Sequence, residues 1–252
     1  MTRRRHHNGD HGAVTEDDLF PIRDTVMRRE TPLAVWALIA INVIVFLIEL
    51  SLPQRTLEWV FYHFGLVPAR YADVYFKAWF GPTADSIWPF ITNMFLHGSW
   101  MHLIGNMWAL WIFGGSVEDR MGHWRFVSFY LICGIAASLT HYVTNLHSTI
   151  PALGASGAIA GVMGAYLLMF PTAQVITLIP LGFIPFFVPI PAVLFIGAWF
   201  LTQLFSGVYA LVAPQFGGGI AWWAHIGGMV AGMVLFPVFH RRSHFRDGIY
   251  SS

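Results

Sequence analysis

The sequence GASGAIAGVMG, residues 154–164, places a serine at the start of a glycine-rich apolar segment. It lies within the 115 residues between Arg125 and Arg241, which contain no Asp, Glu, Lys or Arg. The whole chain is 56% hydrophobic and 11% charged, whereas soluble domains carry about 25% charged residues. This composition indicates a membrane-spanning domain, and the few polar groups within it become candidates for function because they are costly in lipid.

Six segments of the chain are long and apolar enough to cross about 30 Å of hydrocarbon. They lie at residues 33–50, 99–117, 125–144, 153–170, 190–212 and 220–239. We therefore expect an all-α membrane protein, in which residues 32–240 form a bundle of six transmembrane helices. Basic cytoplasmic tails, residues 1–31 and 241–252, are expected to flank this domain. With only one cysteine, Cys133, no disulfide framework is expected.

Basic residues predict the orientation of the bundle. An even number of spans puts both termini on one side, and 11 of the 14 Lys and Arg residues fall on that side. The positive-inside rule then places both ends in the cytoplasm. The first 32 residues are polar and carry six arginines, so we expect no cleavable signal peptide and a multi-pass protein of the cell inner (cytoplasmic) membrane.

Three connections have a distinctive composition. Residues 51–98 are rich in aromatic side chains, which favours an external segment partly embedded in the membrane interface. Residues 171–189 contain four prolines, which predict a cytoplasmic connector that breaks helix repeatedly. The glycines at 217–219, in the last external loop, could form a lid hinge or a simple turn, and the sequence favours neither.

Polar side chains on three spans are expected to meet, because spans 2, 4 and 6 all enter the membrane from the external side. Ser99 is a suitable N-cap for span 2, which puts His102 and Asn106 on one face of its first two turns. Ser156 opens span 4, and His225 lies roughly 8 Å below the start of span 6. Four polar groups from three helices thus converge at similar depth.

Small residues predict close packing of spans 4 and 6, since they let two helix backbones approach. They are Gly157, Gly161 and Gly164 on span 4, and Gly228 and Gly232 beside His225 on span 6. Packing these faces together would bring His225 toward Ser156. A neutral imidazole there could take the serine proton and later deliver it to a leaving amine. The Ser156 backbone N–H, the Asn106 amide and the His102 ring are candidate donors to an oxyanion.

Four motifs occur in order along this part of the chain. They are His97-x4-His102-x3-Asn106 on span 2, Glu118-x-Arg120 after it, Gly154-x-Ser156-Gly157 opening span 4, and Ala224-His225 followed by Gly228 on span 6. Together they resemble the rhomboid intramembrane serine proteases, over about residues 33–240. One departure is visible: the family often shows Trp-Arg in the long first loop, whereas Trp88 is followed here by Pro89.

The resemblance implies a six-transmembrane-helix rhomboid-like bundle of the bacterial type. It implies an endopeptidase that cleaves transmembrane-helix protein substrates near the external membrane face. It also implies that Ser156 is the nucleophile, that His225 is the general base and acid, and that His102 and Asn106 are the oxyanion donors.

Other polar residues have structural interpretations. His97 would point about 140° away from His102 on an extended helix, so we expect it to hold a loop. Glu118 and Arg120 are expected to form an ion pair, and Glu49 is expected to reach water at the external boundary of span 1.

Two other functions remain open. A catalytically silent relative could bind membrane helices, although it would need neither Ser156 nor His225. A transporter or metal site could use His97, His102 and His225, but the sequence lacks HExxH, an inverted repeat and any carboxylate ligand in spans 3–6. We therefore expect a serine endopeptidase with no metal and no cofactor. Its expected partners are transmembrane protein substrates and the lipid bilayer, with no nucleic acid.

Overall fold

The computed structural model describes residues 24–181, 184–212 and 221–241. Most of the two predicted tails and most of the glycine-containing last loop lie outside the described residues. Six helical segments occupy the predicted spans. They are α1 (Leu33–Ser51), the run α6 (Trp100–Ala109), η4 (Leu110–Gly114) and α7 (Gly115–Met121), α8 (His123–Thr144), α9 (Ser156–Met169), α10 (Ala192–Val212) and α11 (Trp222–Phe239). The predicted helical membrane bundle is confirmed.

The six segments differ in their fit to a bilayer. Four helices of the described chain, α1, α8, α10 and α11, are long and apolar enough to cross a membrane by length and composition. The second predicted span is interrupted by one π-helical turn, η4, and α9 has only 14 residues, or about 21 Å. The short α9 suits its central place, because its residues from Gly157 to Tyr166 are all buried by the surrounding helices.

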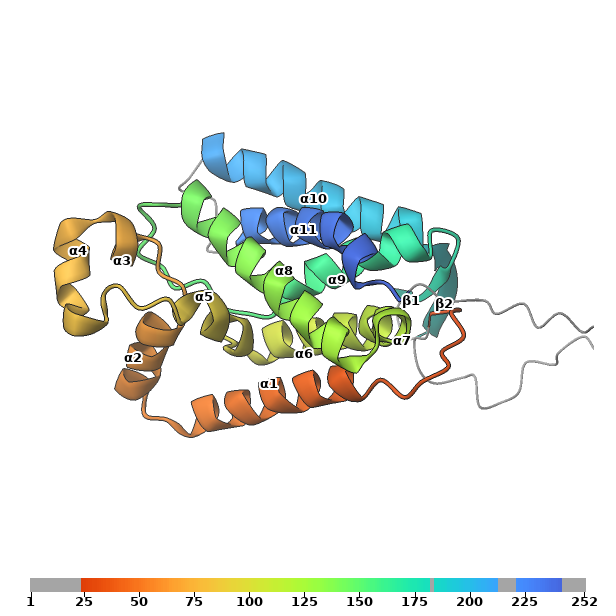
Figure 1. Cartoon of the computed structure of the whole chain (residues 1–252), viewed down its shortest axis with the longest axis horizontal. Helices are drawn as coiled ribbons and strands as arrows, with labels where there is room; N and C mark the ends of the chain where they lie inside the picture. The colour runs from red at the N-terminus through yellow and green to blue at the C-terminus, as the bar shows by residue number, and fades with distance from the viewer. Residues whose placement is uncertain (1–23, 182–183, 213–220, 242–252) are drawn as a thin grey trace, which may run out of the picture.

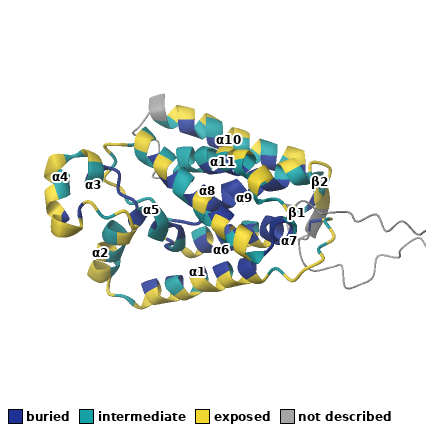
Figure 2. Ribbon diagram, in the orientation of Figure 1, coloured by how far each residue is buried: buried dark blue, intermediate teal, exposed yellow. Residues whose placement is uncertain are grey.

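The arrangement of the helices follows from this buried centre (Figure 1). Helix α9 is packed between α8 and α11, while α1 and α10 lie along opposite edges of the bundle. Figure 2 shows buried residues concentrated around α9 and exposed ones along α1 and α10. The exposed side chains of the two edge helices include Ile44, Ile48, Leu194 and Phe205, which is the apolar surface that lipid requires.

Two glycines of α11 determine how closely it approaches α9. A methyl group at Gly228 would overlap the carbonyl oxygen of Gly157, and one at Gly232 would overlap that of Gly161. Only hydrogen at these positions lets the two backbones touch. The predicted close packing of the fourth and sixth spans is therefore confirmed.

Short helices form most of the connection between α1 and α6. They are α2 (Gln54–Phe64), α3 (Ala69–Ala72), α4 (Val74–Trp79), η2 (Gly81–Thr83), α5 (Pro89–Thr92) and η3 (Asn93–Phe95). Many of their aromatic side chains pack against one another, for example Tyr62 against Trp79 with ring centroids 5.5 Å apart. A backbone bridge between Leu66 and Ala152 ties this connection to the segment that leads into α9.

Arg70 anchors the connection from within. Its side chain is buried, with 1% of its surface exposed, and its Nε donates to the carbonyl of Ala84 (3.2 Å). The Nη atoms donate to the carbonyls of His63 (3.1 Å) and Thr83, and the guanidinium lies 4.5 Å from the centre of the Phe80 ring. Pro89, where the resemblance leads one to expect arginine, instead occupies the first turn of α5, a position that needs no N–H donor.

The predicted helix-breaking connector forms two strands, β1 (Gln174–Leu181) and β2 (Ile184–Pro191). They pair antiparallel, with Gln174 opposite Pro191 and Leu181 opposite Ile184. Each strand of a two-stranded ribbon is an edge strand, which tolerates proline because half of its N–H groups need no partner. Proline content predicted the loss of helix here, but not the strand pairing.

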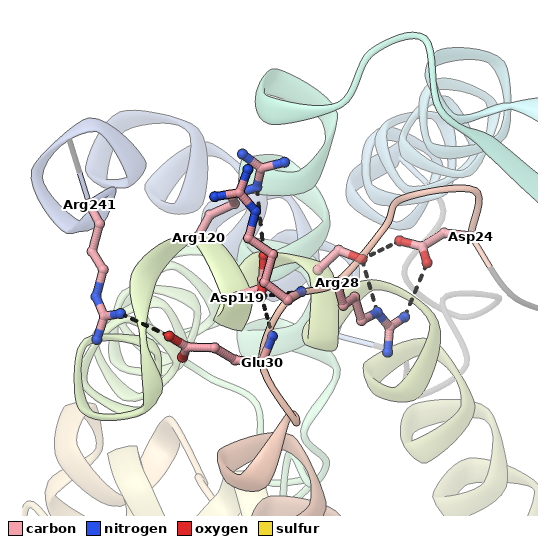
Figure 3. Close-up of polar contacts among 8 residues, drawn as sticks. Asp24, Arg28, Glu30, Asp119, Arg120 and Arg241 are labelled. Carbon is pink, nitrogen blue, oxygen red and sulfur yellow. Dashed lines mark hydrogen bonds and ion pairs between the residues drawn. The ribbon is translucent and has the colours of Figure 1, made fainter. Parts of the chain in front are cut away.

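Residues 24–30 are bound to the end of the bundle that carries β1 and β2, opposite α2–α4 (Figures 1 and 3). Asp119 accepts hydrogen bonds from the backbone N–H groups of Arg29 and Glu30 at 2.8 Å. Arg28 donates to Asp24 (3.1 Å) and to Ser116 (3.2 Å). Arg241 donates to Glu30 (3.4 Å). These contacts join the residues before α1 to α7 and to the end of α11.

The expected ion pair between Glu118 and Arg120 is wrong. Glu118 accepts hydrogen bonds from the backbone N–H groups of Ala34 (2.9 Å) and Val35 (2.8 Å), the first turn of α1. Pro32, the N-cap residue of α1, offers no side-chain acceptor, so the carboxylate of Glu118 satisfies these amides instead. Residues two apart in a helix do not face each other, and Arg120 lies 3.9 Å from Asp119.

Candidate active site

Ser156 and His225 are in direct contact although they lie 69 positions apart in the sequence. Ser156 Oγ and His225 Nε2 lie 2.7 Å apart, within hydrogen-bond distance. Ser156 is the first residue of α9, and His225 lies in the first turn of α11. The close approach of these two helices at Gly157, the residue after Ser156, and at Gly228, one turn after His225, brings the two side chains together. The sequence predicted this meeting from the same glycine stripes.

His225 has a second partner that sequence reasoning missed. Its Nδ1 lies 2.7 Å from Oε1 of Gln203, a residue of α10 with 5% of its surface exposed. The imidazole also packs against Trp199, one turn earlier on α10, with ring centroids 5.7 Å apart and planes inclined by 38°. A glutamine in the middle of an apolar span is costly unless bonded, and this signal in the sequence could have identified it.

His102 and Asn106 approach the backbone immediately before Ser156. Ser99 caps α6 as predicted, because its Oγ accepts from the backbone N–H of His102 (3.2 Å). Gly154 has φ of +119°, and a methyl group there would lie 2.5 Å from Nε2 of His102 and 3.3 Å from Nδ2 of Asn106. The four side chains proposed from the sequence are thus gathered around residues 154–156.

The start of α9 adds backbone donors to this cluster. Ala155, its N-cap residue, has no side-chain acceptor, so the first-turn amides of α9 are not capped by it. Such amides, at the positive end of a helix dipole, favour a negative charge nearby. The Nδ2 of Asn106 and the Nε2 of His102 lie on the same side of Gly154, so donors from two helices point toward one small region.

His97 belongs to the same cluster, contrary to the expectation that it points away from His102. Helix α6 begins only at Trp100, so the helical geometry behind that expectation does not extend to His97. Its ring centroid lies 5.1 Å from that of His102, and its Nε2 accepts from Nδ2 of Asn106 (3.0 Å). His97 therefore orients the Asn106 amide.

Glu49 was expected to reach water, and that expectation is wrong. Its side chain is buried, with 3% of its surface exposed, because residues 93–97 pack over the end of α1. Its carboxylate oxygens lie 3.3 and 3.4 Å from the backbone nitrogen of His97, which donates to them. Glu49 thus fixes the position of His97, which in turn contacts Asn106.

A small cavity of about 20 Å³ adjoins Ser156. Its lining includes the polar side chains of Asn93, Ser138 and His141. A volume of this size is enough for one water molecule with several polar partners. A far larger cavity, of about 840 Å³, lies among the aromatic residues of α2 and α4, away from Ser156.

The residues that the structure describes include no group of three or more His, Cys, Asp or Glu placed to hold a metal ion. Of the three histidines considered above as a metal site, His97 and His225 direct their Nε2 atoms to Asn106 and Ser156 instead, while the His102 ring lies beside Gly154. Their arrangement gives a proton-transfer pair and a set of donors, which is the chemistry of acyl transfer.

Comparison with known proteins identifies the family. A family model described as "Rhomboid domain" matches residues 84–242. Similar proteins include Rhomboid protein 1, mitochondrial, from Saccharomyces cerevisiae (32% identical over 148 residues), Presenilin-associated rhomboid-like protein, mitochondrial, from Mus musculus (31% over 153 residues) and RHOMBOID-like protein 5 from Arabidopsis thaliana (36% over 80 residues).

The matches cover 57%, 58% and 32% of this chain and 39%, 36% and 26% of the respective relatives. The chain therefore spans well under half the length of these relatives. Two of the three are named as mitochondrial, so they do not support the bacterial type that the resemblance implied. The match over residues 84–242, which contains all the motifs and five of the six helical spans, shows that this chain belongs to the rhomboid family.

Proposed function

We propose that this protein is an intramembrane serine endopeptidase, which cleaves transmembrane-helix protein substrates through a dyad of Ser156 and His225. The observation that carries the proposal is the 2.7 Å contact between Ser156 Oγ and His225 Nε2. Membership of the rhomboid family supports an intramembrane protease as the general kind of function. The contact supports the more specific proposal that this chain has the nucleophile and the base that the reaction needs.

The reaction proceeds in two halves. The Oγ of Ser156 attacks the carbonyl carbon of the scissile peptide bond while His225 Nε2 takes the hydroxyl proton. The resulting tetrahedral intermediate collapses, the C–N bond breaks, and His225 returns the proton to the leaving amine. Water then attacks the acyl-enzyme ester by the same proton transfers in reverse, which releases the new carboxylate and regenerates Ser156.

Donors around Gly154 stabilise the oxyanion that forms in each half. We assign this role to Nδ2 of Asn106, Nε2 of His102 and the backbone N–H of Ser156. The amide of Asn106 has one hydrogen engaged by His97, which leaves the other free for the oxyanion. Donors fixed in advance, in a site with little water, act strongly on charge that develops only in the transition state.

Water and substrate must both reach a serine within the membrane. The cavity beside Ser156, with Asn93, Ser138 and His141 in its lining, is suited to hold the hydrolytic water. The segment that leads into Ser156 is bridged to residues 51–98 through Ala152 and Leu66, so we expect cleavage near the membrane face that carries this connection. A substrate helix must unwind there, which favours small or helix-breaking residues at the cut.

We further propose a multi-pass location with both termini in the cytoplasm, on the strength of the basic residues gathered at that end. The cell inner membrane is the proposed membrane, and the lipid bilayer and transmembrane proteins are the proposed partners. The described residues hold no metal-binding group that this reaction would use.

Labelling with a fluorophosphonate probe tests the dyad without a known substrate. Purified wild-type protein should be labelled, Ser156→Ala should not be, and His225→Ala should be labelled at least about a hundredfold more slowly. Ser51→Ala and His147→Ala, which change the same residue types at exposed positions, serve as matched controls and should label like wild type. Equal labelling of folded wild type and Ser156→Ala would contradict the proposal and favour a helix-binding relative without activity.

A further inference from the structure

Gln203 is an unusual residue for its position in the fold. It lies in the middle of α10, an edge helix whose neighbouring residues Leu201, Thr202 and Phe205 are exposed, yet its own side chain is buried. A buried primary amide needs partners for two N–H groups and one oxygen. Its contacts therefore show what this side chain is arranged to do.

The partners of the amide nitrogen fix which way the group points. Nε2 of Gln203 donates to the carbonyl oxygen of Trp199 (3.1 Å) and to Oγ1 of Thr202 (2.9 Å). The carbonyl can only accept, and Oγ1 of Thr202 already donates its own proton to that same carbonyl (2.6 Å). Both partners thus require a donor from Gln203, and the oxygen Oε1 must face His225.

An oxygen acceptor 2.7 Å from Nδ1 determines the tautomer of His225. Two acceptors at that distance would repel, so Nδ1 carries the proton. In a neutral imidazole Nε2 is then unprotonated and accepts the hydroxyl proton of Ser156, 2.7 Å away. We infer that Gln203 is a positioning residue, which holds His225 in the tautomer and orientation of a general base toward Ser156. This inference rests on the proposed function.

The same helix also supports the ring from its face. Trp199 packs against His225, with ring centroids 5.7 Å apart, and an indole face stabilises the imidazolium that forms during proton transfer. Gln203 and Trp199 are four residues apart and lie on one side of α10. Catalytic competence of His225 therefore depends on α10 being docked against α11, although α10 carries neither member of the dyad.

Substitutions at Gln203 test this role against a transmembrane reporter substrate. Gln203→Leu keeps the size of the side chain but removes the acceptor, and it should lower kcat about ten- to hundredfold with little change in KM. Gln203→Glu keeps an acceptor toward Nδ1 but loses the donor to Trp199 and Thr202, so it should restore part of the turnover at alkaline pH. Gln54→Leu makes the same chemical change on the exposed face of α2 and should act like wild type.

The pH profile separates positioning from mere folding. The titratable side chains facing His225 are His102 on α6 and His141 on α8, and all these variants leave both unchanged. A carboxylate at 203 favours the imidazolium, so the acid limb of the kcat profile should move up by about one pH unit in Gln203→Glu. Loss of the acceptor disfavours the imidazolium, so the limb should move down in Gln203→Leu.

Nuclear magnetic resonance of ¹⁵N-labelled histidine gives a readout that needs no activity. The ring signal lost in His225→Ala should show a protonated Nδ1 in wild type and a mixture of tautomers in Gln203→Leu. Wild-type turnover and an unshifted acid limb in folded Gln203→Leu would overturn the role of Gln203 alone. An Nε2-protonated ring in wild type would overturn both that role and the general base assigned to His225. Wild-type turnover that survives Ser156→Ala would overturn the proposed function itself.

Discussion

At the scale of single residues, the site is a chain of polar groups in which each fixes the next. The carboxylate of Glu49 accepts from the backbone of His97, and the ring of His97 accepts from the amide of Asn106. Asn106 in turn lies beside Gly154, two residues before the serine. Buried polar groups of this kind are costly unless bonded, so the network holds Asn106 in one orientation before any substrate arrives.

Asn106→Ala should therefore lower kcat by about 10²- to 10³-fold and change KM much less, because the donor it removes acts mainly in the transition state. Steady-state cleavage of a transmembrane reporter measures both constants. Asn42→Ala is the matched control: Asn42 is a buried asparagine of α1 whose amide donates to Leu38 of the same helix. It should lower the melting temperature yet leave kcat intact. Retention of more than about a third of wild-type kcat in Asn106→Ala would contradict the oxyanion role.

Sequence reasoning reached the four central side chains but not those that support them. Ser156, His225, His102 and Asn106 were accessible because helix periodicity and shared membrane depth depend on local spacing alone. Gln203 and Glu49 were not, because their roles depend on which side chain of a neighbouring helix they meet. The prediction for His97 failed for a third reason: it extended a helix backward beyond Ser99, the residue that caps it.

At the scale of helices, the contact between α9 and α11 sets the geometry of the dyad. The hydroxyl of Ser156 meets the imidazole of His225 because the two backbones touch where Gly228, one turn along α11 from His225, contacts Gly157. A small displacement of either helix would stretch a 2.7 Å contact beyond hydrogen-bond range. Packing and the proposed catalysis are thus coupled through residues that carry no functional group.

Gly228→Ala should destabilise the protein by about 1–3 kcal/mol, since its methyl group overlaps backbone that has nowhere to move. It should also slow fluorophosphonate labelling of Ser156 at least about tenfold when the rate is expressed per folded protein. Thermal unfolding in detergent and labelling kinetics measure the two effects. Gly197→Ala, on α10, meets no atom within 4 Å and should be neutral or slightly stabilising. Full labelling by folded Gly228→Ala would show that the dyad tolerates the displacement.

The long connection between α1 and α6 depends on one buried cation. Arg70→Lys should destabilise this connection by about 2 kcal/mol or more, because an ammonium cannot reproduce the three carbonyl contacts of a planar guanidinium. Limited proteolysis within residues 51–98 measures local opening directly. Arg55→Lys, at an exposed position of α2, should leave the cleavage rate unchanged. Equal protection of the Arg70→Lys variant would mean that the aromatic packing alone holds the connection.

The sequence predicted some elements more completely than others, for physical reasons. Long apolar runs identify the spans, because the thickness of a bilayer fixes the length of a helix. The prolines of residues 171–189 excluded helix but carried no information on partners, and the pairing of β1 with β2 is a contact between residues distant along the chain. Arg70 was equally out of reach, since its carbonyl partners are defined only by the fold of the connection.

At the scale of the whole molecule, the two polar ends of the bundle have different roles. One carries residues 51–98 and the dyad, and the other gathers Asp24, Arg28, Asp119 and Arg241 in ion pairs and hydrogen bonds (Figure 3). Glu118 there also completes the first turn of α1. The charged end therefore fixes α1 and α11 to α7, while the other end is held by the hydrogen bonds of two buried charged groups, Glu49 and Arg70.

The proposed membrane orientation can be measured with two substitutions. Met27 precedes α1 along the chain and Tyr75 follows it. They have 90% and 92% of their surface exposed, whereas Cys133 has none exposed. An impermeant maleimide applied to intact bacterial cells should label Tyr75→Cys, and should label Met27→Cys only after the membrane is opened, because basic residues stay in the cytoplasm. Wild type, with its buried Cys133, is the unlabelled control. The reverse pattern would place the dyad at the cytoplasmic face, and cleavage of substrates would then release their fragments into the cytoplasm.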